Sequence, residues 1–448
     1  MAVTSHALRR TVLPQGMLAR VVFWAVVAVN VLIVWTLFVA AGPGKNSILT
    51  VAKFFGLHVA LLMMLQFVLV ARLPWLDRRI GMDRLTAWHR WVGFGLLWTV
   101  LLHASFVVVG YATLGDDPII GTFFALAGVP ASLLGICAAA IIVAVAAVSI
   151  RYARRRLPYE VWHALHLAVY VVLVLGLLHQ YKETTTFKAS SFATAYWWTA
   201  WTLVITALVV GRVGLPVWRN VYHRFRVAAV VPESPNTVSV YVTGRHLDRL
   251  PARAGQFFIW RFPGHNGWFQ ANPFSLSAAP DGRSLRLTAK AVGRTSAGLR
   301  RLPVGSRVFV EGPYGAFTNL TRARRDTVLI AGGVGITPIR ALLEESTQST
   351  VVLYRVATPA NAVLLDEIQQ LVQDRGARLH LLTGRTGAGS PPNAPFEPGS
   401  LHALVPDIAD RDVYVCGPPA MTNTVLRGLR ALRVPRAQVH SERFGLGG

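Results

Sequence analysis

The chain has 448 residues, of which 53% are hydrophobic and 15% are charged, and its mean hydropathy is +0.44. These values are high for a soluble protein and predict several membrane spans together with soluble domains. Lysine and arginine outnumber aspartate and glutamate by 45 to 21, which gives a net charge of +24. In a membrane protein such a surplus is expected at the cytoplasmic face, where it also attracts anionic lipid. The arginines are scattered and show no aromatic-interleaved basic motif, so we expect a lipid bilayer and not nucleic acid as a partner.

Six apolar runs are each long enough to cross a bilayer as a helix. They lie near residues 20–41, 48–71, 87–110, 129–150, 159–180 and 196–217. Arginines cluster before the first run, between the second and third, and between the fourth and fifth. The positive-inside bias therefore predicts a multi-pass protein of the plasma or inner membrane with both termini in the cytoplasm. The opening residues show no clear cleavage site, which favours a retained first span over a signal peptide.

Two of the apolar runs carry histidines near both ends, where lipid offers an imidazole no bonding partner. His89 and His103 are about 40° short of four full turns and roughly 21 Å apart along a helix, so they share one face. The fifth run holds His166 and His179, with His163 as the alternative to His166. Facing pairs at two depths suit two haem irons that are each held axially from both sides. The other interpretation is a set of interhelical hydrogen bonds.

The step from His166 to His179 leaves the two side chains about 140° apart on an ideal helix. The fifth helix must therefore be bent or distorted if both histidines face the same partner helix. Ionisable residues at such depths are rare, and this rarity favours the haem interpretation over the structural one. The two cysteines, Cys137 and Cys416, form no plausible disulfide or iron–sulfur framework.

After about residue 220 the apolar runs give way to β-branched segments with period two, such as 236–244 and 284–293, separated by Gly, Pro and Asp turns. This pattern predicts a small antiparallel β-barrel. Further on, strands alternate with helical segments, which predicts an α/β domain with a parallel nucleotide-binding sheet. The expected order is a cytoplasmic segment (1–19), a six-helix transmembrane bundle (20–220), the β-barrel (221–322) and the α/β domain (323–448).

A glycine-rich turn, from Gly332 to Pro338, ends a strand and opens a helix of the expected α/β domain. Glycines let the backbone approach a pyrophosphate, and the free N–H groups of the helix start attract its charge. The turn has Pro338 where a third glycine would complete the dinucleotide fingerprint. Arg355 follows the next strand in place of an acidic residue, and Arg385 offers a second cation. These arginines favour NADPH over NADH, the alternative being two solvated surface side chains.

Six segments, in this order and spacing, resemble the ferredoxin-reductase family of flavoproteins: PFSLS, KAVGRTSAGL, VEGPYGAF, AGGVGITP, VYVCGPPAM and SERF. With six spans and paired histidines before them, the chain is similar to the ferric reductase and NADPH oxidase superfamily in its single-chain bacterial form. The resemblance implies three kinds of cofactor, namely FAD, two b-type haems and NADPH or NADH. It implies electron transfer from cytoplasmic NAD(P)H to an acceptor outside, either O2 or a ferric chelate.

The resemblance also implies which residues form the sites. The FAD site falls on Asn272, Pro273, Phe274, Ser275, Leu276, Ser277, Gly293, Thr295, Ser296 and Phe444. The NAD(P)H site, with the two arginines above, falls on Gly332, Gly333, Gly335, Thr337, Pro338, Arg355, Arg385, Cys416, Gly417 and Pro418. The haem irons are expected on His89, His103, His166 and His179. Ser275 near the flavin N5 edge, Cys416 near the hydride-transfer position and Phe444 over the flavin are the expected catalytic residues.

Two other functional classes stay open. As an electron-donor subunit for a membrane or external partner protein, the chain would hold both cofactors but reduce oxygen and iron poorly. As an interaction scaffold with decayed sites, it would lack haem and flavin absorbance. The glycines and histidines present at every motif argue against the scaffold.

Overall fold

The computed structural model describes residues 15–150, 153, 156–157, 159–265, 272–384, 386–387 and 393–443. It divides into two compact units, each assembled from separate stretches of the chain. The first, called here the helical unit, comprises Val21–Leu73 and Asp83–Leu215. The second, called the mixed unit, comprises Met1–Arg20, Pro74–Met82 and Pro216–Gly448.

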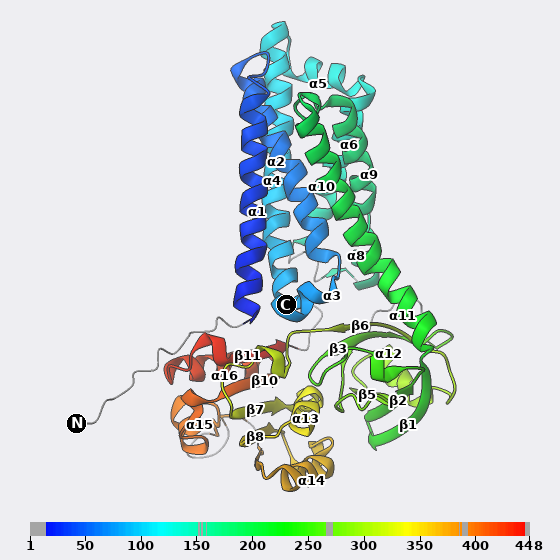
Figure 1. Cartoon of the computed structure of the whole chain (residues 1–448), viewed down its shortest axis with the longest axis vertical. Helices are drawn as coiled ribbons and strands as arrows, with labels where there is room; N and C mark the ends of the chain where they lie inside the picture. Colours follow the sequence, from blue (N-terminus) through cyan, green and yellow to red (C-terminus); the bar gives the residue numbers. More distant parts are fainter. Residues whose placement is uncertain are drawn as a thin grey trace, which may run out of the picture. The chain divides into compact units, whose positions relative to one another are not determined.

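Among the described residues, six helices are long and apolar enough to cross a membrane, which confirms the six predicted spans. The spans run beside one another in Figure 1, coloured from blue to green. The first four are α1 (Gln15–Ala40), α2 (Ser47–Val70), α4 (Met82–Gly115) and α6 (Pro130–Ser149). The fifth span consists of α8 (Tyr159–His166) and α9 (Val169–Glu183). The sixth consists of α10 (Ser191–Val209), a π-helical turn (Val210–Gly214) and α11 (Leu215–His223). A short helix, α5 (Ile119–Ala127), joins the third span to the fourth.

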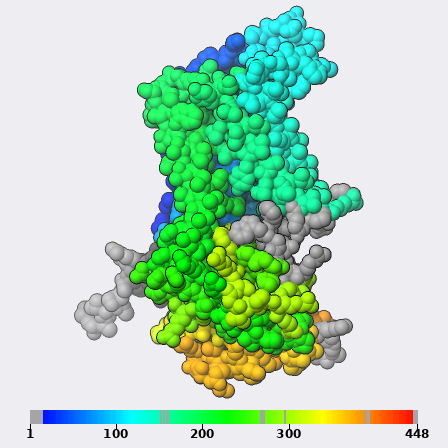
Figure 2. Space-filling model, turned by 90° about the vertical axis from the view of Figure 1, so that its right-hand side faces the viewer, coloured from blue at the N-terminus to red at the C-terminus, as the bar shows by residue number. Residues whose placement is uncertain are grey.

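The surface of the helical unit is apolar. Figure 2 shows α10, in green, along one face of this unit. On this helix Leu203 is 65% exposed, Val209 54% and Trp198 46%. Contiguous exposed apolar surface of this kind is stable against lipid and not against water. The helical unit is therefore a multi-pass membrane domain.

The fifth span is interrupted between its two histidines. Helix α8 ends at His166, and α9 begins three residues later. Around the break the N–H groups of Ala168, Tyr170 and Val171 each donate to the carbonyl three residues earlier, at 3.1, 3.0 and 2.9 Å. Residues in such tight turns advance by about 120° instead of about 100°, so the break rotates the following helix. The distortion that the spacing of His166 and His179 requires is thus present in the span.

The first part of the mixed unit is antiparallel, as predicted, but it consists of two three-stranded sheets and not of one continuous barrel sheet. One sheet has the order β1 (Arg226–Ser234), β2 (Thr237–Thr243), β5 (Ser284–Lys290), and the other β4 (Asn272–Ser275), β3 (Phe257–Arg261), β6 (Phe309–Tyr314). Both contribute side chains to one core, including Val240, Phe258 and Leu287. Period-two alternation predicts strands but does not specify which strands pair, and this explains the difference.

The second part of the mixed unit is a five-stranded sheet in which all neighbouring strands are parallel, as predicted. Its order is β11 (Val439–Arg443), β10 (Asp412–Gly417), β7 (Thr327–Gly332), β8 (Thr350–Arg355), β9 (Arg378–Leu382). Helices α13 (Ile336–Glu344) and α14 (Leu365–Arg375) cover one face, and α15 (Pro398–Leu404) and α16 (Pro419–Ala431) cover the other. The strand order reverses at β7, and ligands bind at the carboxyl ends of the strands beside such a reversal.

The connection between the second and third spans belongs to the mixed unit. It forms a short helix, α3 (Pro74–Ile80). Asp77 of this helix is 1% exposed, and its Oδ2 atom accepts a hydrogen bond of 2.7 Å from the N–H of Gly315, just after β6. A buried carboxylate needs such a donor, so this bond fixes α3 to the end of β6.

Three charged side chains join the antiparallel part of the mixed unit to the parallel part. Arg286 of β5 donates from both terminal nitrogens to the two carboxylate oxygens of Glu367 on α14, at 2.9 Å each. Arg340 of α13 lies 2.9 Å from the same carboxylate. Burial alone would raise the pKa of Glu367, but the hydrogen bonds and charges of the two arginines outweigh it, so this pKa is lowered.

We expect Glu367→Gln to destabilise the mixed unit by about 1–2 kcal/mol, because it leaves the buried Arg286 without a charged partner. A lowered folded-state pKa means that this stabilisation is present above the ordinary value of 4.5 and is lost as the pH falls through the folded value. Unfolding midpoints of the two chains should therefore differ at pH 7 and converge in acid. Asp366→Asn, which removes an exposed charge from the same helix, is the control, and an equal loss in both variants would contradict the assignment.

Candidate functional site

His103 and His179 have the same geometry on two different helices. Nδ1 of His103 lies 2.9 Å from the carbonyl oxygen of Ala52, and Nδ1 of His179 lies 2.8 Å from that of Ala131. A carbonyl only accepts, so the hydrogen of each ring is assigned to Nδ1, and Nε2 keeps its lone pair. This is the neutral tautomer in which histidine binds a metal while a backbone carbonyl fixes the ring.

A glycine makes room for each of these two rings. A Cβ atom at Gly56 would lie 2.8 Å from Cε1 of His103, and one at Gly135 would lie 2.9 Å from Cε1 of His179. Each glycine follows the carbonyl-bearing alanine by four residues, so both helices carry the pattern Ala-x-x-x-Gly. We did not identify these glycines from the sequence. The available signal was a small-xxx-small pattern repeated in two spans, which also occurs at ordinary helix contacts.

His89 and His166 face each other, with ring centroids 6.0 Å apart and ring planes at 70°. Imidazole nitrogens bond metals at about 2 Å, so two such bonds in line, with the ring radii added, account for about 6 Å. Nδ1 of His89 is buried and has no hydrogen-bond partner in the part of the chain that the structure describes. The indole ring of Trp162 stacks on His166 at 5.1 Å. Of the two candidate histidines near the start of the fifth span, His166 is thus the one opposite His89.

His58, which also lies within a span, is bound differently. Its Nδ1 atom is 2.8 Å from the carbonyl oxygen of Phe54, and its Nε2 atom accepts a hydrogen bond of 2.9 Å from the indole N–H of Trp35. Both ring nitrogens are therefore engaged within the protein. This arrangement separates a structural membrane histidine from the four that keep a nitrogen for a ligand.

The four histidines occur in pairs, and this arrangement bears on whether they suit a haem or an isolated metal ion. Among the described residues, no three His, Cys, Asp or Glu side chains gather as they do in a metal site built from protein alone. Each pair would supply two nitrogens to a haem, which brings its remaining iron ligands with it. The four histidines therefore fit two haems better than two isolated ions.

The glycine-rich turn lies at the carboxyl end of β7, and its glycines do two different things. Gly333 has a φ of +53° and an added Cβ would meet no atom within 4 Å, so its backbone is open to a ligand. A Cβ at Gly335 would lie 2.3 Å from the carbonyl oxygen of Cys416, so this glycine lets the turn pack against β10. An exposed turn at a helix start is suited to a pyrophosphate.

The remaining residues of this turn are structural in the described chain. An added Cβ at Gly332 would lie 2.5 Å from the sulfur of Met421, and one at Gly417 would lie 2.6 Å from its Cε atom. Thr337 donates from its hydroxyl to the carbonyl of Val334 at 3.1 Å. Pro338 is buried in the first turn of α13. Most of the predicted dinucleotide residues thus shape the turn, and Gly333 is the one whose backbone is open.

Cys416 is the last residue but one of β10 and is fully buried. Burial, with a contribution from Glu442, raises the pKa of its thiol well above the ordinary value. The thiol is therefore protonated at neutral pH and is not a nucleophilic thiolate. Its predicted place near hydride transfer is compatible with a small apolar group and not with covalent chemistry.

The predicted flavin segment, like the glycine-rich turn, contains residues that are open to a ligand and residues that are used in packing. Ser275, at the end of β4, is 3% exposed, and its Oγ atom has no hydrogen-bond partner among the described residues. Ser277 instead accepts from Thr288 at 2.7 Å and from Arg286 at 3.1 Å, so it belongs to the packing between strands. Leu276 is a fully buried core residue. Ser275 is therefore the hydroxyl of this segment that is available to a ligand, beside the half-buried Asn272, Pro273 and Phe274.

The second predicted flavin segment forms a short helix, α12 (Arg294–Gly298). The hydroxyl of Ser296 accepts from the N–H groups of Val292 and Gly293 at 3.0 and 3.1 Å, so it is used by its own turn. An added Cβ at Gly293 would meet nothing within 4 Å. The side chain of Thr295, and the whole of Arg385 and Phe444, lie outside the described part of the chain.

Arg355 is held by the loop after β9. It is 9% exposed, and it donates to the carbonyl of Thr383 at 2.7 Å and to the hydroxyl of Thr386 at 3.4 Å. Burial lowers the pKa of its guanidinium. The side chain is thus braced against the protein, and the preference for NADPH stays a prediction.

Two family models match the chain. A model described as ferric reductase like transmembrane component matches residues 55–177, and one described as oxidoreductase NAD-binding domain matches residues 329–427. The chain joins a ferric-reductase-like transmembrane domain to an NAD-binding oxidoreductase domain. This pairing confirms the resemblance to the ferric reductase and NADPH oxidase superfamily. The first match contains His89, His103 and His166, and ends two residues before His179.

Several similar curated proteins are described as reductase components of oxygenases. The chain is 28% identical over 233 residues to the reductase component of propane 2-monooxygenase from Mycolicibacterium smegmatis, covering 49% of this chain and 67% of that protein. It is 32% identical over 207 residues to the ferredoxin reductase component of 3-ketosteroid-9-alpha-monooxygenase from Mycobacterium tuberculosis, covering 44% and 56%. A flavohemoprotein from Vibrio cholerae is 30% identical over 215 residues, covering 45% and 53%. The last two alignments cover less than two thirds of those relatives.

Among solved structures, the flavohem-like FAD/NAD binding domain of a nitric oxide dioxygenase from Vibrio cholerae is 25% identical, with a TM-score of 0.40. The match covers 50% of this chain and 98% of that one.

We expect Gly56→Ala and Gly135→Ala to weaken haem binding by the adjacent histidine about 10- to 100-fold, as loss of a ligand-orienting contact does. The added methyl group would occupy the space of the imidazole ring. The measurement is the b-type haem absorbance per chain. Gly95→Ala, at a glycine of α4 whose added Cβ meets no atom within 4 Å, is the matched control. Unchanged haem content in both test variants would show that the rings do not depend on these glycines.

We expect Cys416 to resist iodoacetamide at pH 7 to 8 in the folded protein, because only the thiolate reacts and burial keeps the thiol protonated. Raising the pH to the ordinary thiol pKa of 9.0 should leave it unmodified, since its own pKa lies well above that value. Peptide mass spectrometry before and after denaturation measures the modification. Rapid labelling of the native chain at pH 8 would contradict the buried placement.

Proposed function

We propose that the chain carries electrons across a membrane, from NAD(P)H bound at the mixed unit to an acceptor on the opposite side. The observation that supports this most strongly is the presence of two histidine pairs in one apolar bundle. In each pair the structure leaves ring nitrogens without protein partners among the described residues. His89 of one pair and His103 of the other both lie on α4, roughly 21 Å apart along the helix axis. The two pairs therefore lie at two depths.

The cofactors of the proposal are FAD, two b-type haems, and NADPH or NADH. FAD, when bound, accepts two electrons as a hydride and releases them singly, which is the form that haem iron takes. The name of one relative, a flavohemoprotein, supports a flavin site.

The protein's own groups have distinct tasks in this scheme. The open backbone at Gly333 admits the dinucleotide pyrophosphate, and the buried hydroxyl of Ser275 offers a hydrogen bond to the flavin. Cys416 fills space beside the reacting rings without competing as a nucleophile. The carbonyls of Ala52 and Ala131 hold Nδ1 of His103 and His179 protonated, so that the Nε2 atoms of these two rings would be free to hold a haem iron.

The proposed acceptor is O2, giving superoxide, or a ferric chelate, giving ferrous iron. Both need the same arrangement of cofactors. The proposed orientation has both termini in the cytoplasm, because the arginine-rich connections lie on that side.

A second candidate is an electron-donor subunit that reduces a partner protein. The relatives described as reductase components of monooxygenases favour it. Such a subunit would contain the same cofactors, so cofactor content alone does not separate the two functions.

We expect the purified chain to contain two haems and one FAD, and we expect His103→Ala or His179→Ala to lower the haem content to one while FAD remains. Pyridine haemochrome and flavin absorbance measure both. His58→Gln is the control, because that histidine is bound within the protein. Two haems retained in both alanine variants would contradict the assignment of the outer pair.

The acceptor is tested on the loaded chain with NADPH. Superoxide-dismutase-sensitive cytochrome c reduction reports oxygen reduction, and ferrozine capture reports ferric reduction. Slow reduction of both acceptors by a fully loaded chain would favour the electron-donor subunit.

A further inference from the structure

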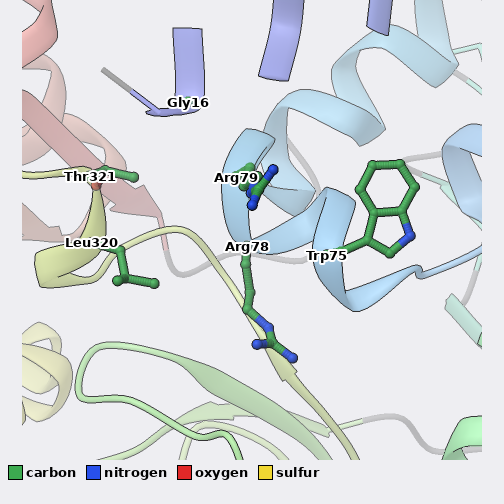
Figure 3. A pocket seen from close by; sticks show the side chains of 6 residues that line it. All are labelled: Gly16, Trp75, Arg78, Arg79, Leu320 and Thr321. Atoms are coloured by element: carbon green, nitrogen blue, oxygen red, sulfur yellow. The ribbon is translucent and has the colours of Figure 1, made fainter. Parts of the chain in front are cut away.

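A cavity of about 190 Å³ lies in the mixed unit, apart from the turn and the strand ends described above. Three of its lining side chains come from α3, and the others come from the start of α1 and from the segment after β6. They are Gly16, Trp75, Arg78, Arg79, Leu320 and Thr321. Figure 3 shows the side chains of α3 and those of Leu320 and Thr321 on opposite sides of the space.

The cavity is positively charged, because two arginines line it. No hydrogen bond or ion pair of the Arg78 or Arg79 side chain occurs within the described part of the chain, and the Nε atom of Arg78 is buried without a partner. The neighbouring carboxylate, Asp77, accepts from Gly315. Burial, and then repulsion by Arg253, lower the pKa of Arg78, whereas Asp77 raises it.

The position of the cavity relative to the membrane follows from chain connectivity. Gly16 is the first residue of the first span. Trp75 follows the end of the second span at Val70 by five residues, which reach at most about 18 Å when extended. Trp75 is 61% exposed, as tryptophans at the membrane–water interface are. The cavity therefore lies at the depth of the lipid headgroups, on the side of the membrane where the NAD-binding domain lies.

We propose that this cavity binds the phosphate of an anionic phospholipid headgroup. Guanidinium groups match phosphate oxygens in geometry as well as charge. Basic pockets beside transmembrane helices on this face are the kind of site that holds acidic lipid. Free inorganic phosphate has the same chemistry, but the interfacial depth and the exposed Trp75 favour the lipid. The competing explanation is that the arginines only orient the spans, in which case any nearby arginine would contribute equally.

The test uses the full-length protein in detergent, titrated separately with phosphatidylglycerol, phosphatidylcholine and inorganic phosphate. Native mass spectrometry counts the bound molecules. The wild type should retain one phosphatidylglycerol in preference to phosphatidylcholine. Arg78→Gln/Arg79→Gln should bind it more weakly by about tenfold for each arginine, the loss expected for a charge-assisted hydrogen bond. Arg78→Lys/Arg79→Lys keeps the charge without the forked geometry and should lose part of the affinity.

Arg84→Gln/Arg90→Gln is the matched control, because both arginines are exposed at the start of α4 and the same charge is removed. Retention of phosphatidylglycerol by this control above the level of the Arg78/Arg79 variant supports the cavity. Equal losses in the two arginine variants would overturn it and leave only diffuse charge attraction. Binding of inorganic phosphate without a preference for phosphatidylglycerol would overturn the lipid assignment. Unchanged unfolding midpoints establish that each variant is folded.

Discussion

The helical unit depends on how an imidazole is accommodated where there is no water. An unpaired polar group in hydrocarbon costs several kcal/mol, so each ring must be bonded or must bind a ligand. For His103 and His179 the solution is one carbonyl for Nδ1 and a glycine beside the ring, while Nε2 keeps its lone pair. For His58 both nitrogens are bonded within the protein. The same residue type thus performs two tasks, and the difference lies in its neighbours on adjacent helices.

Much of this arrangement could be predicted from the sequence. Apolar run length predicts the six spans, and histidine spacing predicts which residues share a face. The spacing also required a distortion before His179, and the structure has one in the tight turns around Ala168. Its position could not be predicted, because nothing in LHLAVY is a glycine or proline that would mark it. The carbonyls and glycines that hold the rings could not be predicted either, because they depend on which helices pack together.

In the mixed unit, sequence reasoning predicted which segments lie together better than what each residue contacts. The glycine-rich turn and the carboxyl end of β10 do lie side by side, as a parallel sheet requires. Within the turn, however, Gly335 is needed for contact with β10, and Gly333 is the open one. Ser275 and Ser277 are two residues apart and equally conspicuous, yet one is unpartnered among the described residues and the other is bonded between strands. Strand pairing decides such differences, and pairing is not local information.

The connection between the second and third spans shows why composition alone is an incomplete guide to charge. Its arginines satisfy the positive-inside bias, which depends only on their number and location. That bias does not explain why Asp77 is buried or why it bonds Gly315. Burying a carboxylate is unfavourable without a donor, so the bond has to form if α3 is to pack on β6. Once Asp77 faces the strand, the adjacent Arg78 and Arg79 must leave the helix in other directions, toward the cavity. The basic cavity is therefore a consequence of the acidic contact that fixes α3 in place.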